Sequence, residues 1–196
     1  MRLKKQLGLA AAMVCLCAFT ATISAQDSWT LDNESSSLTF VTTKLDHIPE
    51  ALSFKEISGT LHADGTANLS IAVDSLDALF EIRDERMKEH LFKMVDFPNI
   101  SISTQVDMEA IGAIPTGETV SMAIETTMEL LGAEHAVPAE VLVTNFGEGL
   151  VISSSKPVLL NALPLGLEEG VAKLSELAGG IQISQAVSVS FSLRFD

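Results

Sequence analysis

Residues 81–104 read EIRDERMKEHLFKMVDFPNISIST, and no other stretch says as much about the architecture. In its first half, charged residues surround an apolar stripe that includes Met87 and Leu91, four positions apart as on one face of a helix. Pro98 ends that pattern, because proline cannot continue a helix. Beyond it, apolar and polar residues alternate as in a strand. The stretch therefore predicts a short helix over about 81–93 that passes directly into a β-strand.

Alternation with a period of two dominates the rest of the chain. It is clearest at the C-terminus, where every second position is apolar: Val187, Val189, Phe191, Leu193 and Phe195. Residues 69–73 and 121–128 alternate in the same way, and further strand candidates lie at 29–32, 36–45, 53–62, 99–108, 138–145 and 150–160. Strands with one apolar face and one polar face are typical of antiparallel sheet.

Short turn sequences separate these segments, at Asp64-Gly65, Pro115-Thr116-Gly117 and Gly147-Glu148-Gly149. Strands joined in sequence by short turns favour an all-β barrel or sandwich over a parallel α/β fold. A second apolar stripe at helical spacing begins at Leu167 and predicts a second short helix over about 165–178. We expect each helix to lie across the barrel surface or to close one mouth.

The first twenty-five residues have the layout of a cleaved secretory signal peptide. A positively charged start is followed by an apolar run over 7–19 and by a small residue, Ala25, ahead of polar residues. We place cleavage after Ala25, which predicts an exported protein whose residues 26–196 form a single domain. Both cysteines, Cys15 and Cys17, precede that point, so the exported part depends on its core rather than on disulfides.

The charge balance narrows the choice of partners. Three of the twelve Lys and Arg residues precede position 26 and none of the twenty-six acidic residues does, so the exported part carries a formal net charge of −17. Such a chain is repelled by phosphate backbones and by anionic bilayers. We therefore expect no nucleic-acid partner and no peripheral membrane binding through a basic face.

Catalytic and metal-binding patterns have little support in the sequence. The exported part has no Cys or Tyr, and its histidines are scattered along the chain at His47, His62, His90 and His135. None of them stands in the spacing that organises a metal site or a nucleophile. We predict a protein that is not an enzyme, with no catalytic residues, no metal and no cofactor.

A family resemblance rests on a series of short motifs in a fixed order. The residues concerned are Ser28-Trp29-Thr30-Leu31-Asp32, Ser36-Ser37-Leu38-Thr39-Phe40, Phe54 with Gly59, Arg83-Asp84, His90-Leu91 and Asp96-Phe97-Pro98. Their order resembles that of the YceI-like family of periplasmic lipocalin-like proteins. Two departures, the extra residues at 85–89 and the second helix, affect the region expected to form the barrel mouth.

The resemblance implies an eight-stranded antiparallel lipocalin-like barrel that binds a polyisoprenoid or another long-chain lipid in its interior. An eight-stranded barrel is just wide enough to be filled by side chains or to hold one slim ligand, so the residues alone leave both arrangements open. The polarity of the alternating faces gives the expected apolar interior, which consists of Phe40, Leu69, Ile71, Val73, Met122, Ile124, Met128, Val189, Phe191 and Leu193.

Basic residues are concentrated in the first predicted helix. Arg83 and Arg86 lie there together with two lysines and His90. At a barrel mouth, Arg83, Arg86 and His90 could meet the phosphate or carboxylate head group of a lipid through charge-assisted hydrogen bonds. The alternative is an ordinary solvated helix face, since acidic residues outnumber basic ones in this segment.

Three functional hypotheses follow. The leading one is non-enzymatic binding of a polyisoprenoid or fatty lipid inside a periplasmic barrel, for carriage or storage. The second is an envelope interaction module with a filled barrel that meets a membrane or redox protein. The third is an enzyme acting on a lipid, for which the sequence offers the least support.

Overall fold

The computed structural model describes residues 28–196, so the expected signal peptide at 1–25 lies outside the described part of the chain. The described part is mainly β-strand. The strands are β1 (Ser28–Lys44), β2 (Ile48–Phe54), β3 (Ile57–His62), β4 (Thr66–Ala72), β5 (Leu76–Asp77), β6 (Asn99–Gln105), β7 (Thr119–Leu130), β8 (Ala133–Asn145), β9 (Leu150–Ser154), β10 (Val158–Asn161) and β11 (Ala186–Phe195).

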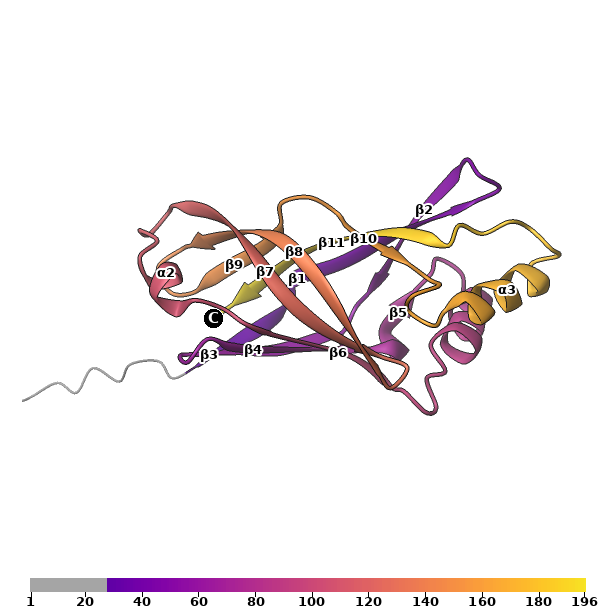
Figure 1. Cartoon of the computed structure of the whole chain (residues 1–196), viewed down its shortest axis with the longest axis horizontal. Coiled ribbons are helices and arrows are strands. Elements are labelled where there is room, and N and C mark those ends of the chain that lie inside the picture. The colour runs from indigo at the N-terminus through magenta and orange to yellow at the C-terminus, as the bar shows by residue number, and fades with distance from the viewer. Residues whose placement is uncertain (1–27) are drawn as a thin grey trace, which may run out of the picture.

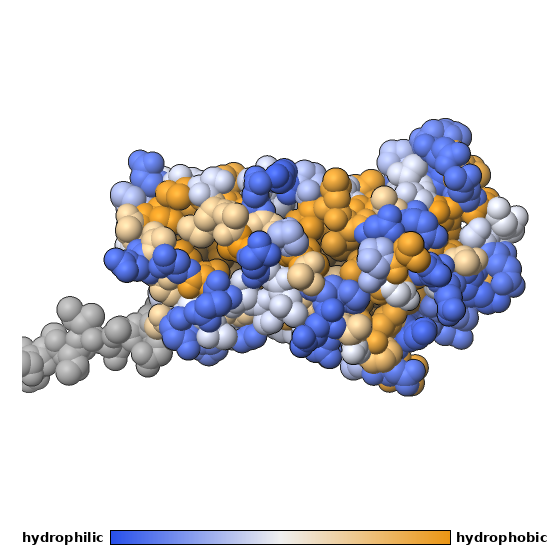
Figure 2. Space-filling model, in the orientation of Figure 1, coloured by the Kyte–Doolittle hydropathy of each residue, from blue (hydrophilic) through white to orange (hydrophobic). Residues whose placement is uncertain are grey.

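Eight of these strands close into an antiparallel barrel (Figure 1). The order around the ring is β1-β3-β4-β6-β7-β8-β9-β11, and β11 pairs back onto β1 with Phe191 opposite Leu38. Polar and small residues dominate the outward positions of most strands, and hydrophilic and hydrophobic residues are interspersed on the face shown in Figure 2. The eight-stranded antiparallel barrel that the family resemblance implies is thus confirmed, and the alternative of a sandwich is not.

The remaining three strands extend the barrel at one end. β1 pairs with β3 through residues 28–30 and with β2 through residues 38–44, so β2 and β3 are two parts of one barrel strand. The side chain of Asn33 spans the break between them, donating to the carbonyl of Lys55 at 3.0 Å and accepting from the amide of Ile57 at 2.7 Å. β5 continues this end of the sheet beside β2, and β10 does so beside β11.

Four predicted strands had wrong boundaries, in three places along the chain. Residues 29–32 and 36–45 belong to one strand with a bulge, in which the Ser36 hydroxyl donates to the carbonyl of Asp32 and accepts from the amide of Arg194. Residues 53–62 and 150–160 are each divided in two. In the second case Pro157, which has no backbone N–H, lies in the break between β9 and β10.

Two helical segments lie together at the extended end of the barrel (Figure 1). The first is α1 (Glu81–Arg86), which continues as a π-helical turn, η2 (Met87–Leu91), and the second is α3 (Glu168–Leu177). They pack closely because α3 has a glycine at the contact: a Cβ on Gly170 would lie 2.8 Å from the carbonyl oxygen of His90. Both predicted helices are confirmed, apart from the π-helical geometry.

A third short helix, α2 (Met108–Gly112), lies at the opposite end of the barrel and was not predicted (Figure 1). The strand expected over 99–108 ends at Gln105 instead. Asp107 caps α2, because its carboxylate accepts hydrogen bonds from the amides of Glu109 and Ala110. A short turn, η1 (Val73–Ser75), similarly ends the strand expected over 69–73.

Candidate ligand-binding cavity

The barrel encloses a cavity of about 500 Å³ that is lined mainly by apolar side chains. Its wall follows β11 from Val187 to Phe195, eight residue steps at about 3.4 Å each, or roughly 27 Å along the strand. It reaches Ile111 of α2 at one end and Arg83 of α1 at the other. The shape is that of a long channel suited to an extended apolar chain.

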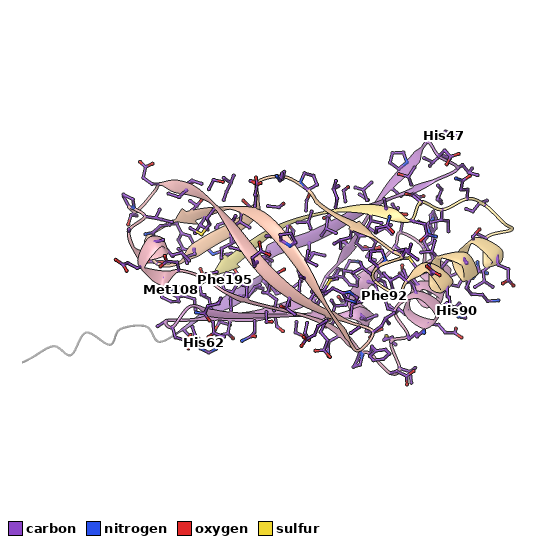
Figure 3. The ribbon with its side chains drawn as sticks, viewed as in Figure 1. His47, His62, His90, Phe92, Met108 and Phe195 are labelled. Atoms are coloured by element: carbon purple, nitrogen blue, oxygen red, sulfur yellow. The ribbon has the colours of Figure 1, made fainter. Side chains whose placement is uncertain are left out.

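The cavity is closed beside α2 and opens beside α1. Ile111 and Phe195 at the α2 end are 3% and 2% exposed. Phe80 and Ile82 border the cavity at the α1 end and are 60% and 55% exposed. Figure 3 shows Phe195 near α2 and Phe92 at the helical end of the barrel. We call the opening beside α1 the mouth.

Nine of the ten predicted interior residues line this cavity. They are Phe40, Leu69, Ile71, Met122, Ile124, Met128, Val189, Phe191 and Leu193. The tenth, Val73, is buried but does not line the cavity, because the chain leaves the sheet after β4 and Val73 forms part of η1. Its amide donates to the carbonyl of Pro98 rather than to a barrel strand.

The barrel is hollow along part of its length. Met122 and Ile124 point into the barrel and line the cavity, yet both remain half-buried rather than fully buried. Ile102 and Val189 behave in the same way. A filled barrel core would bury such inward residues on all sides. The sequence left open a barrel filled by side chains and a barrel with room for a ligand, and the structure has the second arrangement.

Several wall residues were missed, and most of them follow the pattern already used. Ile100 and Ile102 of β6, and Val137, Ala139 and Val141 of β8, occupy the inward positions of their strands. The two helical segments add Met87, Leu91, Phe92, Leu167, Val171 and Leu174. In the π-helical turn the amide of Phe92 bonds to the carbonyl of Met87, five residues earlier, and Met87, Leu91 and Phe92 all face the cavity.

Four charged side chains line the mouth: Lys44, Glu50, Arg83 and Arg86, which we call the mouth cluster. The Glu50 carboxylate lies 2.9 Å from Lys44 Nζ and 3.0 Å from Arg83 Nη1. The Arg83 guanidinium also lies 5.1 Å from the centre of the Phe80 ring. The Arg86 guanidinium donates from Nη1 to the carbonyl oxygen of Leu177 at 3.1 Å, which ties α1 to the end of α3.

The three residues predicted as head-group contacts have different positions. Arg83 and Arg86 line the mouth, whereas His90 does not line the cavity. The Nε2 atom of His90 lies 3.8 Å from Oε2 of Glu89. Lys44 and Glu50 were not predicted. Sequence contained a signal for them, because Lys44 is four positions after inward Phe40 and Glu50 is two before inward Leu52.

The ion pairs of Glu50 affect its titration. Burial acts to raise the pKa of the Glu50 carboxyl, but hydrogen bonds and charge attraction from Lys44 and Arg83 outweigh it and hold the pKa below its ordinary value. A carboxyl with a lowered pKa stabilises the folded state above its unfolded pKa. That contribution is lost as the pH falls through the lower, folded pKa.

This gives a prediction for stability. At neutral pH, Glu50→Gln should lower the free energy of unfolding by about 1–3 kcal/mol, because it removes the partner of two part-buried cations. As the pH falls below the ordinary pKa of a glutamate and through the lower pKa of Glu50 in the folded protein, the difference from wild type should shrink toward zero, because Glu50 itself becomes neutral. Urea unfolding of both proteins at several pH values measures it. A difference that stays constant with pH would contradict the account.

The histidines do not come together in the described part of the chain, and no metal-binding cluster is found there. In Figure 3, His47, His62 and His90 lie at separate places, on the β1–β2 hairpin, at the end of β3 and on η2. Across residues 28–196, no three His, Cys, Asp or Glu side chains are grouped so that they could hold a metal ion. No helix within the same range is long and apolar enough to cross a bilayer.

Comparison with protein families gives a match over nearly all of the described residues. The model of the YceI-like domain matches residues 29–195. The chain belongs to the YceI-like family. A search of curated proteins finds no match to this YceI-like chain.

Two solved structures are similar to this YceI-like barrel. The first is a polyisoprenoid-binding domain from Saccharophagus degradans implicated in plant cell wall breakdown, with 27% identity, a TM-score of 0.83, and coverage of 86% of this chain and 97% of that domain. The second is BcnA of Burkholderia cenocepacia, with 16% identity, a TM-score of 0.66, and coverage of 84% of this chain and 98% of BcnA. The second likeness concerns the fold alone.

Proposed function

We propose that this YceI-like protein binds a polyisoprenoid or another long-chain lipid inside its barrel and carries or stores it without chemical change. The observation that carries the proposal is the apolar cavity with charged side chains at its mouth beside α1. The similar domain from Saccharophagus degradans, which is described as polyisoprenoid-binding, adds support for this ligand class. The nine predicted interior residues that line the cavity, the first of them Phe40 and the last Leu193, would contact the lipid tail.

The energetics favour a long apolar ligand. Each methylene group removed from water contributes about 0.8 kcal/mol, and part of that gain is offset by ordering of the chain. Met122, Met128 and Met87 line the wall, and methionine adapts well to an irregular chain because it is flexible and polarizable. Binding can therefore be tight with few polar contacts.

Other features support a binding role without turnover. Among residues 28–196, no His, Cys or Tyr lines the cavity, and the one carboxylate that does so, Glu50, is held in ion pairs. The hollow interior weighs against the alternative of a filled barrel that serves as an envelope interaction module. We place the protein in the periplasm because residues 1–25 have the layout of a signal peptide.

The decisive experiment is to express the whole chain in a Gram-negative bacterium, isolate the protein from the periplasmic fraction, and analyse a solvent extract by mass spectrometry. We expect a protein that begins near residue 26 and carries about one long-chain lipid per barrel. An empty extract, together with no uptake of added geranylgeraniol or fatty acid by the folded protein, would reject the proposal and favour the interaction module.

A further inference from the structure

The charge at the mouth is opposite to that of the protein as a whole. The chain has twelve basic and twenty-six acidic residues. The cavity lining nevertheless contains three basic residues, Lys44, Arg83 and Arg86, and one acidic residue, Glu50. The mouth cluster thus has an excess of two positive charges at the open end of an otherwise apolar channel.

The internal carboxylate does not neutralise this excess. Glu50 shares its Oε2 atom between Lys44 and Arg83, at 2.9 Å and 3.0 Å. Arg86 donates one hydrogen bond, to the neutral carbonyl of Leu177, although a guanidinium has five N–H groups. None of the ion pairs formed among the described residues includes Arg86. The half-buried Arg86 side chain is therefore the least compensated charge at the mouth.

A lipid in the barrel changes the surroundings of these cations. Its polar end would lie among the mouth cluster and displace water from it. A neutral end, such as an alcohol, would remove that water without supplying a counter-charge, and desolvation of a charged group without a partner is costly. A carboxylate or phosphate would supply charge-assisted hydrogen bonds, which are roughly twice as strong as neutral ones.

We infer that the lipid held in this barrel ends in an anionic group, a carboxylate or a phosphate monoester, which pairs with Arg86 and competes with Glu50 for Arg83 and Lys44. The inference rests on the proposed function and adds the chemical class of the ligand's polar end. Glu50 is the internal anion that already pairs with Lys44 and Arg83. Glu50 is thus a specificity-determining residue, because it limits how strongly an anion is attracted.

Matched ligands test the inference. Delipidated protein is titrated by calorimetry with geranylgeraniol, geranylgeranoic acid and geranylgeranyl monophosphate, which share one chain and differ in their ends. We expect the acid, the phosphate or both to bind about ten-fold more tightly than the alcohol. If one of the two anionic ligands binds more tightly than the other, the result shows whether the site prefers a carboxylate or a phosphate monoester.

Variants connect this preference to the mouth cluster. Arg86→Gln should remove most of the difference in affinity between the anionic ligands and the alcohol, because it removes the partner of the anion and also the unpaired charge that an alcohol would desolvate. Glu50→Gln should strengthen anion binding several-fold, because Arg83 and Lys44 lose their internal partner. Lys173→Gln is the control, since Lys173 lies on α3, pairs with Glu176 at 3.0 Å and does not line the cavity; it should keep the preference.

The outcomes separate this inference from the proposed function. Equal binding of all three ligands, or an anion preference that survives in Arg86→Gln, would overturn the inference and leave lipid binding in place. Failure of every ligand to bind to folded protein would overturn the proposed function and the inference with it. Thermal unfolding of each variant establishes that a lost preference does not come from a lost fold.

Discussion

Ile124→Glu should lower the affinity for any long-chain lipid by about a hundred-fold or more. Ile124 lies on β7, points into the barrel and lines the cavity. A carboxylate at this position would face the apolar tail of the lipid. When the lipid enters, the carboxylate must either take up a proton or lose its water, and each costs several kcal/mol of binding free energy. The lipid content of purified protein and titration with geranylgeraniol measure the loss.

Two companion variants make this result specific. Ser121 lies three residues earlier on β7 and its side chain is exposed on the outer face, so Ser121→Glu should bind lipid normally. Ile124→Trp should remain folded while binding less lipid, because the larger ring occupies space in a hollow barrel rather than in a filled one. Normal lipid content in Ile124→Glu would show that the chain does not occupy this cavity.

Gly149→Ala should lower the free energy of unfolding by about 3 kcal/mol or more, the largest stability effect we expect from a single methyl group. Gly149 directly precedes β9, whose first residue pairs with Phe195 of β11. A Cβ at this position would overlap the carbonyl oxygen of Phe195 and press on the Phe146 ring at 2.7 Å. Relief requires separating β9 from β11, which opens the barrel. Urea unfolding monitored by circular dichroism measures it.

Gly112→Ala is the matched control for that substitution. Gly112 ends α2, and a Cβ there would have no atom within 4 Å. Alanine favours helix over glycine by roughly 0.5–1 kcal/mol, so this variant should be unchanged or slightly more stable. If both variants had similar stability, the close approach of Gly149 to Phe195 would not be a constraint on the fold.

The parts of the fold that could be predicted are those with a local cause. The alternation along β11 depends on neighbouring residues, and a side-chain period of two gives the strand, its inward face and most of the cavity wall. The stripe through Met87 and Leu91 gave the first helix in the same way. Barrel closure could not be read from this period, and its prediction depended on the family resemblance.

The parts that were missed depend on contacts between distant residues. The break between β2 and β3 is stabilised by Asn33, more than twenty positions away, and nothing around residue 55 marks it. The mouth cluster combines residues of the β1–β2 hairpin with residues of α1. The role of Glu50 could therefore not be predicted without knowing that Arg83 lies beside it. α2 did carry a local signal, since Asp107 is a favourable N-cap, but the strand pattern before it obscured the helix.

Ile111 and Phe195 are buried at the α2 end of the cavity, so we expect a lipid to enter and leave through the mouth beside α1. A lipid bound as proposed enters tail first and leaves tail last, so its whole length must slide past α1 before it is released. Each methylene returned to water adds about 0.8 kcal/mol to the free-energy cost of release. The association rate depends instead on how often the lipid tail meets the mouth in a suitable orientation. The residence time of the lipid, rather than its association rate, should then increase with every isoprene unit. The barrel would thus select long-chain ligands through their slower dissociation.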